Sequence, residues 1–283
     1  MSDVKPVIVT TDGSAHSLRA VAHAGRIAGA IGAGLEVMRI VEDSDLDGGS
    51  DAAVAQGRER LKAELERELQ REGLAGNAVI ESPGKDEDVT AAILRKARNA
   101  SLLAMNTRGK GVIASLLHGS VALGVLGKAE TPVMLTGPEI LGPQTAGDAY
   151  RLLATTDCSE DSSNVLRALA PLLEGGKFKL TLFFVHEHAP GGTDNAAEMQ
   201  AFEATMQRQR ALLPASLDVE LATREIPRGG GVDTAILEKA RDLDADAIAM
   251  STHGQGARKH AIMGSTAMAT LGRSPVPVIV ARV

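Results

Sequence analysis

Residues 9–14 read Val-Thr-Thr-Asp-Gly-Ser and residues 154–159 read Ala-Thr-Thr-Asp-Cys-Ser, so nearly the same motif returns 145 residues later. The same offset relates a series of positions in their order along the chain: Ile40 and Val185, Gly109 and Gly254, Gly119 and Gly264, Ser120 and Ser265, and Pro132 and Pro277. Two further pairs match at an offset of 143, Ile93 with Ile236 and Arg98 with Arg241. Such a repeat is longer than the roughly 20 to 50 residues of solenoid units and has the length of a complete globular domain. The sequence therefore predicts two homologous domains, at 1–140 and 149–283, joined by a linker at 141–148.

The composition narrows the class of protein that these domains can form. Hydrophobic residues make up 44% of the 283 residues, which is enough for two separate cores. The net charge of −6 gives no basic field for a nucleic-acid backbone, and with 2% aromatic residues there are few platforms on which bases could stack. No apolar run approaches the ~20 residues of a membrane span. A single cysteine, Cys158, and an N-terminus without the layout of a signal peptide favour the cytoplasm.

Short apolar runs alternate with amphipathic segments in each half. In the first half, strands are expected at 7–9, 35–41, 78–80, 102–105 and 133–136, and helices after residue 14 and at 51–72, 89–98 and 120–128. In the second half, strands are expected at 151–155, 178–185, 218–222, 246–250 and 277–281. Strands that are apolar throughout and separated by helices are typical of a buried parallel sheet covered on both faces. The predicted fold class is therefore α/β, with two tandem Rossmann-like domains.

The repeated polar residues fall where the predicted strands end, and ligands of open parallel sheets bind at these carboxyl ends. Asp12 and Asp157 follow the first strand of each half, and Ile40 and Val185 close the second. After the fourth strand, a glycine loop leads through Gly-Ser into a helix, whose unpaired N–H groups bind phosphate. An ionised carboxylate suits the hydroxyls of a ribose, because each oxygen accepts hydrogen bonds. The pattern predicts a nucleotide site, with an acid for the sugar, a strand edge for the base and a glycine loop for the phosphates.

These residues resemble the ATP-binding fingerprint of the universal stress protein family, which reads Gly, two residues, Gly, nine residues, then Gly-Ser or Gly-Thr. The chain has Asn106-Thr-Arg-Gly109, nine residues and Gly119-Ser120, and again Ser251-Thr-His-Gly254, nine residues and Gly264-Ser265. The two openings quoted above, and the endings Thr-Pro-Val-Met-Leu (131–135) and Val-Pro-Val-Ile-Val (276–280), resemble the first and last strands of the family. The resemblance covers nearly the whole chain, twice. It departs from the family where Asn106 and Ser251 replace the first glycine and where Cys158 replaces the usual glycine after the acid.

The resemblance implies a five-stranded parallel sheet in each half, in the strand order 3-2-1-4-5 with helices on both faces, and a pseudo-dimer joined through the last strands. It also implies that at least one half binds ATP or a related adenine nucleotide such as AMP or ADP, and that Mg²⁺ could accompany ATP. A stress-response or regulatory role follows from the same resemblance, and a further homodimer is left open. The expected nucleotide contacts are Thr11, Asp12, Ile40, Asn106, Arg108, Gly109, Gly119 and Ser120 in the first half, and Thr156, Asp157, Val185, Ser251, His253, Gly254, Gly264 and Ser265 in the second.

Plainer interpretations stay open beside this one. Asp12 and Asp157 could serve only as N-caps of the helices that follow them. His186 and His188 flank Glu187, but the further ligands that a metal site needs are not evident. No residue stands out as a general base or an activated nucleophile, so we expect a binding protein without catalytic or metal-ligating residues. The alternatives are a slow ATPase or self-phosphorylating protein, and an interaction scaffold that binds no nucleotide.

Overall fold

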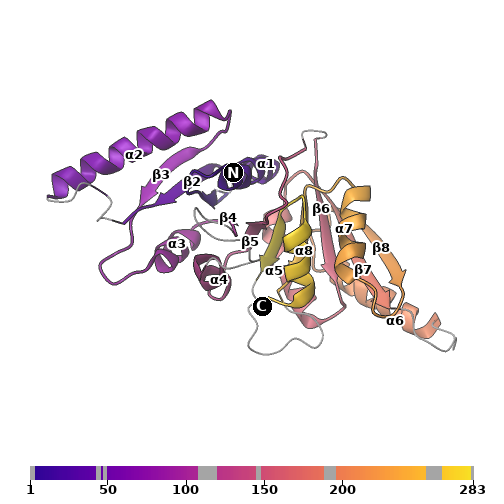
Figure 1. Ribbon diagram of the computed structural model, residues 1–283. Helices are drawn as coiled ribbons and strands as arrows, with labels where there is room; N and C mark the ends of the chain where they lie inside the picture. The colour runs from indigo at the N-terminus through magenta and orange to yellow at the C-terminus, as the bar shows by residue number, and fades with distance from the viewer. Residues whose placement is uncertain are drawn as a thin grey trace.

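The computed structural model describes residues 4–42, 46, 50–107, 120–144, 148–187, 196–252 and 263–281, in which strands and helices alternate (Figure 1). The first half contains β1 (Val7–Thr10), α1 (Ala15–Ile31), β2 (Leu35–Ile40), α2 (Asp51–Arg71), β3 (Asn77–Glu81), α3 (Val89–Ala97), β4 (Leu102–Asn106), α4 (Ser120–Leu126) and β5 (Val133–Thr136). The second half contains β6 (Tyr150–Thr156), α5 (Glu160–Leu173), β7 (Phe178–Glu187), α6 (Ala196–Arg210), β8 (Asp218–Ile226), α7 (Val232–Asp242), β9 (Ala247–Ser251), α8 (Ser265–Arg273) and β10 (Val278–Ala281). Each strand predicted from the sequence is present, and each half has the same order of elements.

The ten strands form one continuous sheet in the order β3-β2-β1-β4-β5-β10-β9-β6-β7-β8. Within each half all neighbouring strands are parallel. Numbered from the start of its own half, each set of strands follows the order 3-2-1-4-5. The predicted fold class is therefore confirmed, down to the order of the strands.

The two halves meet through an antiparallel pair formed by their last strands, β5 and β10. Met134 lies opposite Ile279, which is its own counterpart at the offset of 145. The neighbouring pairs are reciprocal, since Val133 lies opposite Val280 and Leu135 opposite Val278. This register places a local two-fold axis at the Met134–Ile279 pair. Because the strands of the two halves run in opposite directions, their carboxyl ends, and with them the two candidate sites, lie at opposite ends of the sheet.

The helices cover both faces of this sheet because alternate residues of each strand point to opposite sides. Val7 and Val9 pack into a core with residues of α1, α2, α5 and α6, whereas Ile8 packs into a second core with residues of α3, α4, α7 and α8. All three side chains are buried. Both cores run across the junction of the halves, so the two repeats share their interior as well as their sheet.

Helix α1 of the first half also makes hydrogen bonds to the linker and to the second half. His23 Nε2 donates a hydrogen bond to the carbonyl oxygen of Leu141 at 2.8 Å. One turn further along, Arg26 Nε donates to Oδ1 of Asp246 at 3.4 Å, and its Nη2 donates to the carbonyl oxygen of Ala149. His23 and Asp246 are both buried, so this polar contact between the halves is shielded from solvent. The linker boundaries at 141 and 148 remain a prediction.

We expect the buried imidazole of His23 to make stability depend on pH. Burial lowers the pKa of His23 below its ordinary value, and outweighs the Leu141 carbonyl and the Asp246 carboxylate, both of which favour the charged form. Below pH ~6.5 the unfolded chain therefore binds a proton that the folded chain resists, and the free energy of unfolding falls. Denaturant unfolding between pH 7.5 and pH 5 should show a smaller loss for His23→Asn, which keeps a donor but does not titrate. Equal losses in the variant and the parent would contradict this account.

Candidate functional site

The loop after β1 forms a compact turn that its own side chains hold together. Ser14 caps α1, and its Oγ accepts the N–H of Ser17 at 3.3 Å. Asp12 Oδ1 accepts the N–H of Ser14 at 2.9 Å. The buried Thr11 accepts the N–H of Gly13 at 3.1 Å and shares a hydrogen bond with Ser17 Oγ at 2.9 Å. These bonds orient the Asp12 carboxylate at the carboxyl end of β1.

The loop after β6 repeats this geometry in the second half. Ser159 caps α5, and its Oγ accepts the N–H of Ser162 at 3.2 Å. Asp157 Oδ1 accepts from Ser159 twice, from the N–H at 3.1 Å and from the hydroxyl at 2.5 Å. Thr156 Oγ1 accepts the N–H of Cys158 at 2.9 Å. The duplicated Thr-Thr-Asp motif therefore encodes one turn, built twice.

The structure corrects the interpretation of the two aspartates as helix N-caps. The caps are Ser14 and Ser159, which are extended residues whose hydroxyls reach the N–H three residues on. Asp12 and Asp157 precede the caps by two residues and bind backbone of the turn instead. Each carboxylate thus belongs to the loop at the strand end and not to the helix.

The residue after each aspartate has a left-handed backbone. Gly13 has φ +76°, and Cys158 has φ 61°, which for a residue with a side chain costs roughly 1 to 2 kcal/mol. The turn therefore explains why glycine is the usual residue here and why Cys158 is a departure with an energetic cost. Burial raises the pKa of the Cys158 thiol to about 11, and the neighbouring Asp157 raises it further in the same direction.

Cys158 should consequently be a poor nucleophile. With its pKa near 11, the thiolate fraction at pH 7.5 is more than a hundredfold below that of a free cysteine of pKa about 8.5. We expect alkylation by iodoacetamide to be slower than that of free glutathione by about that factor. Because Cys158 is the single cysteine of the chain, the mass increase reports on it alone. A rate equal to that of glutathione would show that the thiol is not held in this environment.

In each half one helix residue lies against the turn, and it is charged in the first half and neutral in the second. In α2, Glu68 lies three residues after the buried Leu65, and its Oε2 pairs with Arg39 Nη2 at 2.6 Å. A Cβ at Gly13 would lie 2.8 Å from Arg39 Nη2 and 3.1 Å from Glu68 Oε1, so this ion pair lies directly against the turn. The first half thus places a half-buried cation and anion beside the Asp12 loop.

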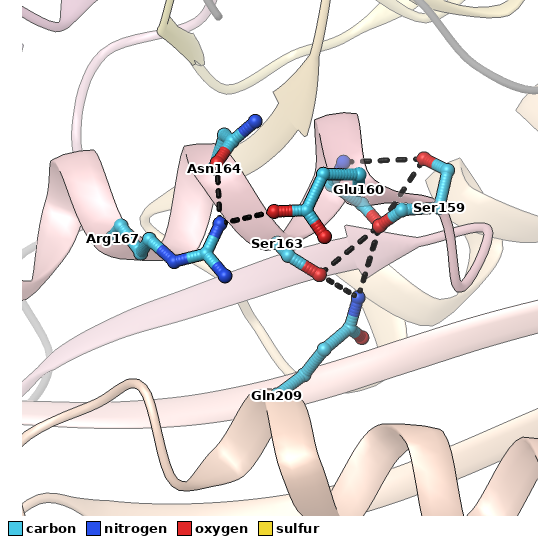
Figure 2. Close-up of polar contacts among 7 residues, drawn as sticks. Ser159, Glu160, Ser163, Asn164, Arg167 and Gln209 are labelled. Atoms are coloured by element: carbon cyan, nitrogen blue, oxygen red, sulfur yellow. Dashed lines mark hydrogen bonds and ion pairs between the residues drawn. The ribbon is translucent and has the colours of Figure 1, made fainter.

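In the second half, Gln209 of α6 takes this place, three residues after the buried Met206. Its Oε1 accepts from Thr156 Oγ1 at 2.8 Å, and its Nε2 donates to Ser162 Oγ at 3.1 Å and to Ser163 Oγ at 3.0 Å. Figure 2 shows Gln209 reaching from its helix to Ser163 and to the backbone of Ser159 at the start of α5. Gln209 is 2% exposed, so this neutral hydrogen-bond network is buried.

The ends of β4 and β9 lie beside these turns, because β4 is the neighbour of β1 and β9 the neighbour of β6. Asn106 and Ser251, which replace the first glycine of the fingerprint, are the last residues of their strands and are half-buried. The buried Thr107 that follows Asn106 donates both its N–H and its hydroxyl to the carbonyl oxygen of Thr136, each at 3.1 Å. The loop after β4 is therefore anchored to β5 at its first residue.

Helix α8 begins at Gly264-Ser265, as the fingerprint predicts. The N–H of Gly264 donates to the carbonyl oxygen of Thr252 at 2.6 Å, which ties the start of α8 to the end of β9. Gly264 is the N-cap of α8, and no described side chain makes a capping hydrogen bond there. Within the part of the chain that the structure describes, the first N–H groups of α8 thus have no side-chain acceptor of the kind that Ser14 and Ser159 provide for α1 and α5.

The described residues bring together part of the site expected from the sequence. In the first half, Thr11, Asp12, Ile40 and Asn106 lie at the carboxyl ends of three adjacent strands, and α4 begins at Ser120, whose side chain is not described. In the second half, the same holds for Thr156, Asp157, Val185 and Ser251, with Gly264 and Ser265 at the start of α8. Arg108, Gly109, Gly119, His253 and Gly254 lie outside the described residues.

An open cleft of about 1180 Å³ lies at this edge of the first half. It is bordered by Glu42, two residues after Ile40, and by Val121, the residue after Ser120. Its further lining comes from the β3–α3 loop, from α3 and from α4: Ser82, Pro83, Gly84, Lys85, Glu87, Asp88, Val89, Thr90, Arg95, Gly124 and Lys128, with Arg58 of α2. Its volume slightly exceeds the ~300 to 1,000 Å³ of small-molecule sites.

Sequence reasoning did not find Arg39, Glu68 or Gln209 as neighbours of the turns. For Glu68 and Gln209 the available signal was a polar residue three positions after an apolar one on a helix, because residues three apart lie side by side. Among the described residues, no group of three or more His, Cys, Asp or Glu side chains could hold a metal. In the same part of the chain, no helix has the length and apolarity to cross a membrane.

Comparison of the sequence with known protein families identifies the family to which the chain belongs. The model of the universal stress protein family matches the chain twice, at residues 3–137 and 150–282. The chain therefore belongs to the universal stress protein family, as a tandem member with two copies of the domain.

Individual relatives agree with this assignment. The universal stress protein Sll1654 of Synechocystis is 28% identical over 130 residues, which cover 46% of this chain and 83% of that protein. A universal stress protein of Archaeoglobus fulgidus has a solved structure that matches with a TM-score of 0.58 at 22% identity, over 98% of this chain and 96% of that one. A putative universal stress protein of Pseudomonas aeruginosa matches with a TM-score of 0.56 at 17% identity, over 98% and 93%. At these identities the solved structures support the fold alone.

Proposed function

We propose that this tandem universal stress protein binds ATP or a related adenine nucleotide in at least one half and acts as a cytoplasmic stress-response or regulatory protein. The observation that carries the proposal is the duplicated arrangement at the strand ends. In each half an aspartate lies in the turn that follows one strand, and the neighbouring strand is the one whose loop leads to a Gly-Ser helix start. Two copies of one binding geometry favour a ligand over a chance cluster of polar residues.

The chemistry of these groups suits a nucleotide. The carboxylates of Asp12 and Asp157 are hydrogen-bond acceptors for a ribose, and the start of α8 at Gly264 carries backbone N–H groups with a partial positive charge for phosphates. Ile40 and Val185, both half-buried, supply apolar contact for a base. An open cleft lies at the same edge of the first half and is bordered by Glu42 and Val121, which are near Ile40 and Ser120 in the sequence. Mg²⁺ would enter with the triphosphate of ATP.

Freshly purified protein provides the direct test. We expect mass spectrometry of acid-released small molecules to find an adenine nucleotide, and calorimetry of the stripped protein to show saturable binding of ATP or AMP. Because the two sites lie at opposite ends of the sheet, up to two nucleotides can bind without touching each other. If no nucleotide is released and titration yields no heat, the protein is better explained as an interaction scaffold.

Hydrolysis of bound ATP should be slow. The described site offers hydrogen-bond donors for phosphate but holds no group positioned to activate water, since the turns place their side chains on backbone and on one another. We expect steady-state turnover far below the ~10 per second typical of enzymes. Phosphate release assays with Mg²⁺–ATP measure it, and a phosphorylated serine in the product would favour the self-phosphorylating alternative. A rate at or above ~10 per second, abolished by one substitution in the cleft, would make the protein an enzyme.

A further inference from the structure

A pocket of about 700 Å³ lies at the junction of the two halves, and we call it the junction pocket. It is bounded by α1 of the first half, by the linker, by α7 and by the segments that lead into β9 and β10. Its volume falls within the ~300 to 1,000 Å³ of small-molecule sites, which form preferentially between domains. None of its described lining residues is an expected nucleotide contact, so any ligand of this pocket is separate from the nucleotide.

Much of the wall of the junction pocket is aliphatic. Leu237 and Ala240 come from α7, and Ala245 and Val276 come from the segments that precede β9 and β10. Leu141 of the linker also lines the pocket and is 62% exposed. A ligand with an apolar body would remove this surface from water, which is favourable.

Two buried polar side chains interrupt this wall, His23 and Asp246. His23 Nε2 carries a proton, because it pairs with the carbonyl oxygen of Leu141, which can only accept. Since burial lowers the pKa of His23, the ring is neutral at pH 7.5 and its Nδ1 is an acceptor. Within the described residues, Nδ1 makes no hydrogen bond. This acceptor therefore needs a donor from outside the chain.

The carboxylate of Asp246 adds further acceptor capacity. Its Oδ2 accepts the N–H of Arg151 at 2.7 Å, and its Oδ1 accepts Arg26 Nε across a long 3.4 Å. Because a carboxylate has about four lone-pair sites, it can accept more hydrogen bonds than these two. Asp246 also favours the charged form of His23 electrostatically, so the two acceptors lie in the same part of the pocket. The buried polar groups of the pocket thus call for a donor and for positive charge.

The charged groups around the pocket favour a cation as well. Among the described lining residues, carboxylates outnumber guanidinium groups: Glu139, Glu238, Asp244 and Asp246 against Arg241 and Arg273. We propose that the junction pocket binds a small amphipathic amine, whose ammonium group donates to His23 Nδ1 and to the Asp246 carboxylate and whose apolar body lies against the aliphatic wall. An ammonium group has several N–H donors and no acceptor, which matches a site that offers acceptors. Because the ligand would contact both halves, it would stabilise the folded protein by mass action.

Phenethylamine is the probe, titrated into the full-length protein at pH 7.5 and followed by calorimetry and ligand-observed NMR. We expect saturable binding with a Kd of about 1 mM or tighter. Phenethyl alcohol has the same apolar body but one donor and no charge, so it should bind at least about tenfold more weakly. Phenylacetate carries the opposite charge and should not bind. The amine should also raise the temperature of thermal unfolding as its concentration rises.

Substitutions then locate the bound amine. Gly142→Trp places an indole at the pocket, and we expect the affinity for phenethylamine to fall at least about tenfold. A Cβ at Gly142 would meet no atom within 4 Å, so this variant should fold. Gly34→Trp is the matched control, since its Cβ also meets no atom within 4 Å and Gly34 does not line the pocket. His23→Phe keeps a planar ring without an acceptor and should weaken amine binding by a similar factor.

Three results would overturn the proposal. One is the absence of saturable phenethylamine binding by the folded protein. Another is equal affinity for the alcohol and the amine, because the acceptors of His23 and Asp246 would then contribute nothing. The third is an affinity that Gly142→Trp leaves at the parent value, since the amine would then bind elsewhere on the protein.

Discussion

Gly264→Val is expected to abolish nucleotide binding in the second half, with a loss of affinity of at least about a hundredfold, or roughly 2.8 kcal/mol. The side chain would stand at the start of α8, where the phosphates are proposed to meet backbone N–H groups, and would keep the anion from approaching them. The backbone itself accepts a side chain, because Gly264 has φ −71° and ψ 162°. A Cβ there would lie 3.3 Å from the carbonyl oxygen of Thr252, a tight contact that a small shift relieves.

Calorimetry with ATP on Gly264→Val, on its counterpart Gly119→Val and on the double variant assigns the binding to each half. Gly34→Val is the matched control, since a Cβ there would meet no atom within 4 Å and Gly34 lies at the amino end of β2, away from the site. Thermal unfolding should confirm that all variants fold. If the double variant binds ATP as the parent does, the glycine loops are not the phosphate site.

Tyr150→Ala should lower the free energy of unfolding by about 3 to 5 kcal/mol, as expected for deleting a buried aromatic ring. Tyr150 is fully buried at the junction of the halves. Its ring packs edge-on against Phe178 at a centroid distance of 5.6 Å, and the guanidinium of Arg26 lies 5.9 Å from its centroid. The substitution therefore leaves a cavity in a core that both halves share, and a single transition at lower denaturant concentration is the expected result.

Tyr150→Phe separates the ring from its hydroxyl. The hydroxyl is buried and makes no hydrogen bond within the described residues, and burial raises the pKa of Tyr150 so that it stays protonated. Removing it should leave stability unchanged or raise it by up to about 1 kcal/mol, because an unsatisfied buried polar group is lost. Urea unfolding of both variants at pH 7 gives the comparison. A loss above ~1 kcal/mol in Tyr150→Phe would show that the hydroxyl has a partner, such as a buried water molecule.

The two turns also differ in a way that bears on which half binds. The first half places the Arg39–Glu68 ion pair beside its aspartate, whereas the second half places the neutral Gln209 beside its own. At the offset of 145, Arg39 corresponds to Phe184, which packs against Phe202 at a centroid distance of 4.5 Å. The two sites therefore offer different charge to a ligand although they share one turn. Unequal affinities of the two halves are the natural consequence.

Most of the fold followed from local pattern. The runs Val7–Thr10 and Leu102–Asn106 carry apolar residues on both faces of the strand, which is typical of a strand buried on two sides. The repeat then predicted the matching strands of the second half. The turns were encoded as well, since Thr-Thr-Asp-X-Ser supplies the side-chain oxygens that accept the backbone N–H groups of the turns. Capping by Asp12 and Asp157 stayed open as an alternative because Asp and Ser are both good N-caps and spacing alone does not separate them.

By itself the sequence determined the duplication, the α/β class and the residues at the strand ends, because these depend on periodicity and on contacts within a few residues. The family resemblance also implied a junction through the last strands, but the tertiary structure alone decided the register in which they pair. Pairing Met134 with Ile279 depends on two strands far apart in the chain, and it sets the candidate sites at opposite ends of one sheet. It also decided that Arg39, Glu68 and Gln209 reach the turns. These features arise from side chains brought together across long separations in sequence, which no local pattern encodes.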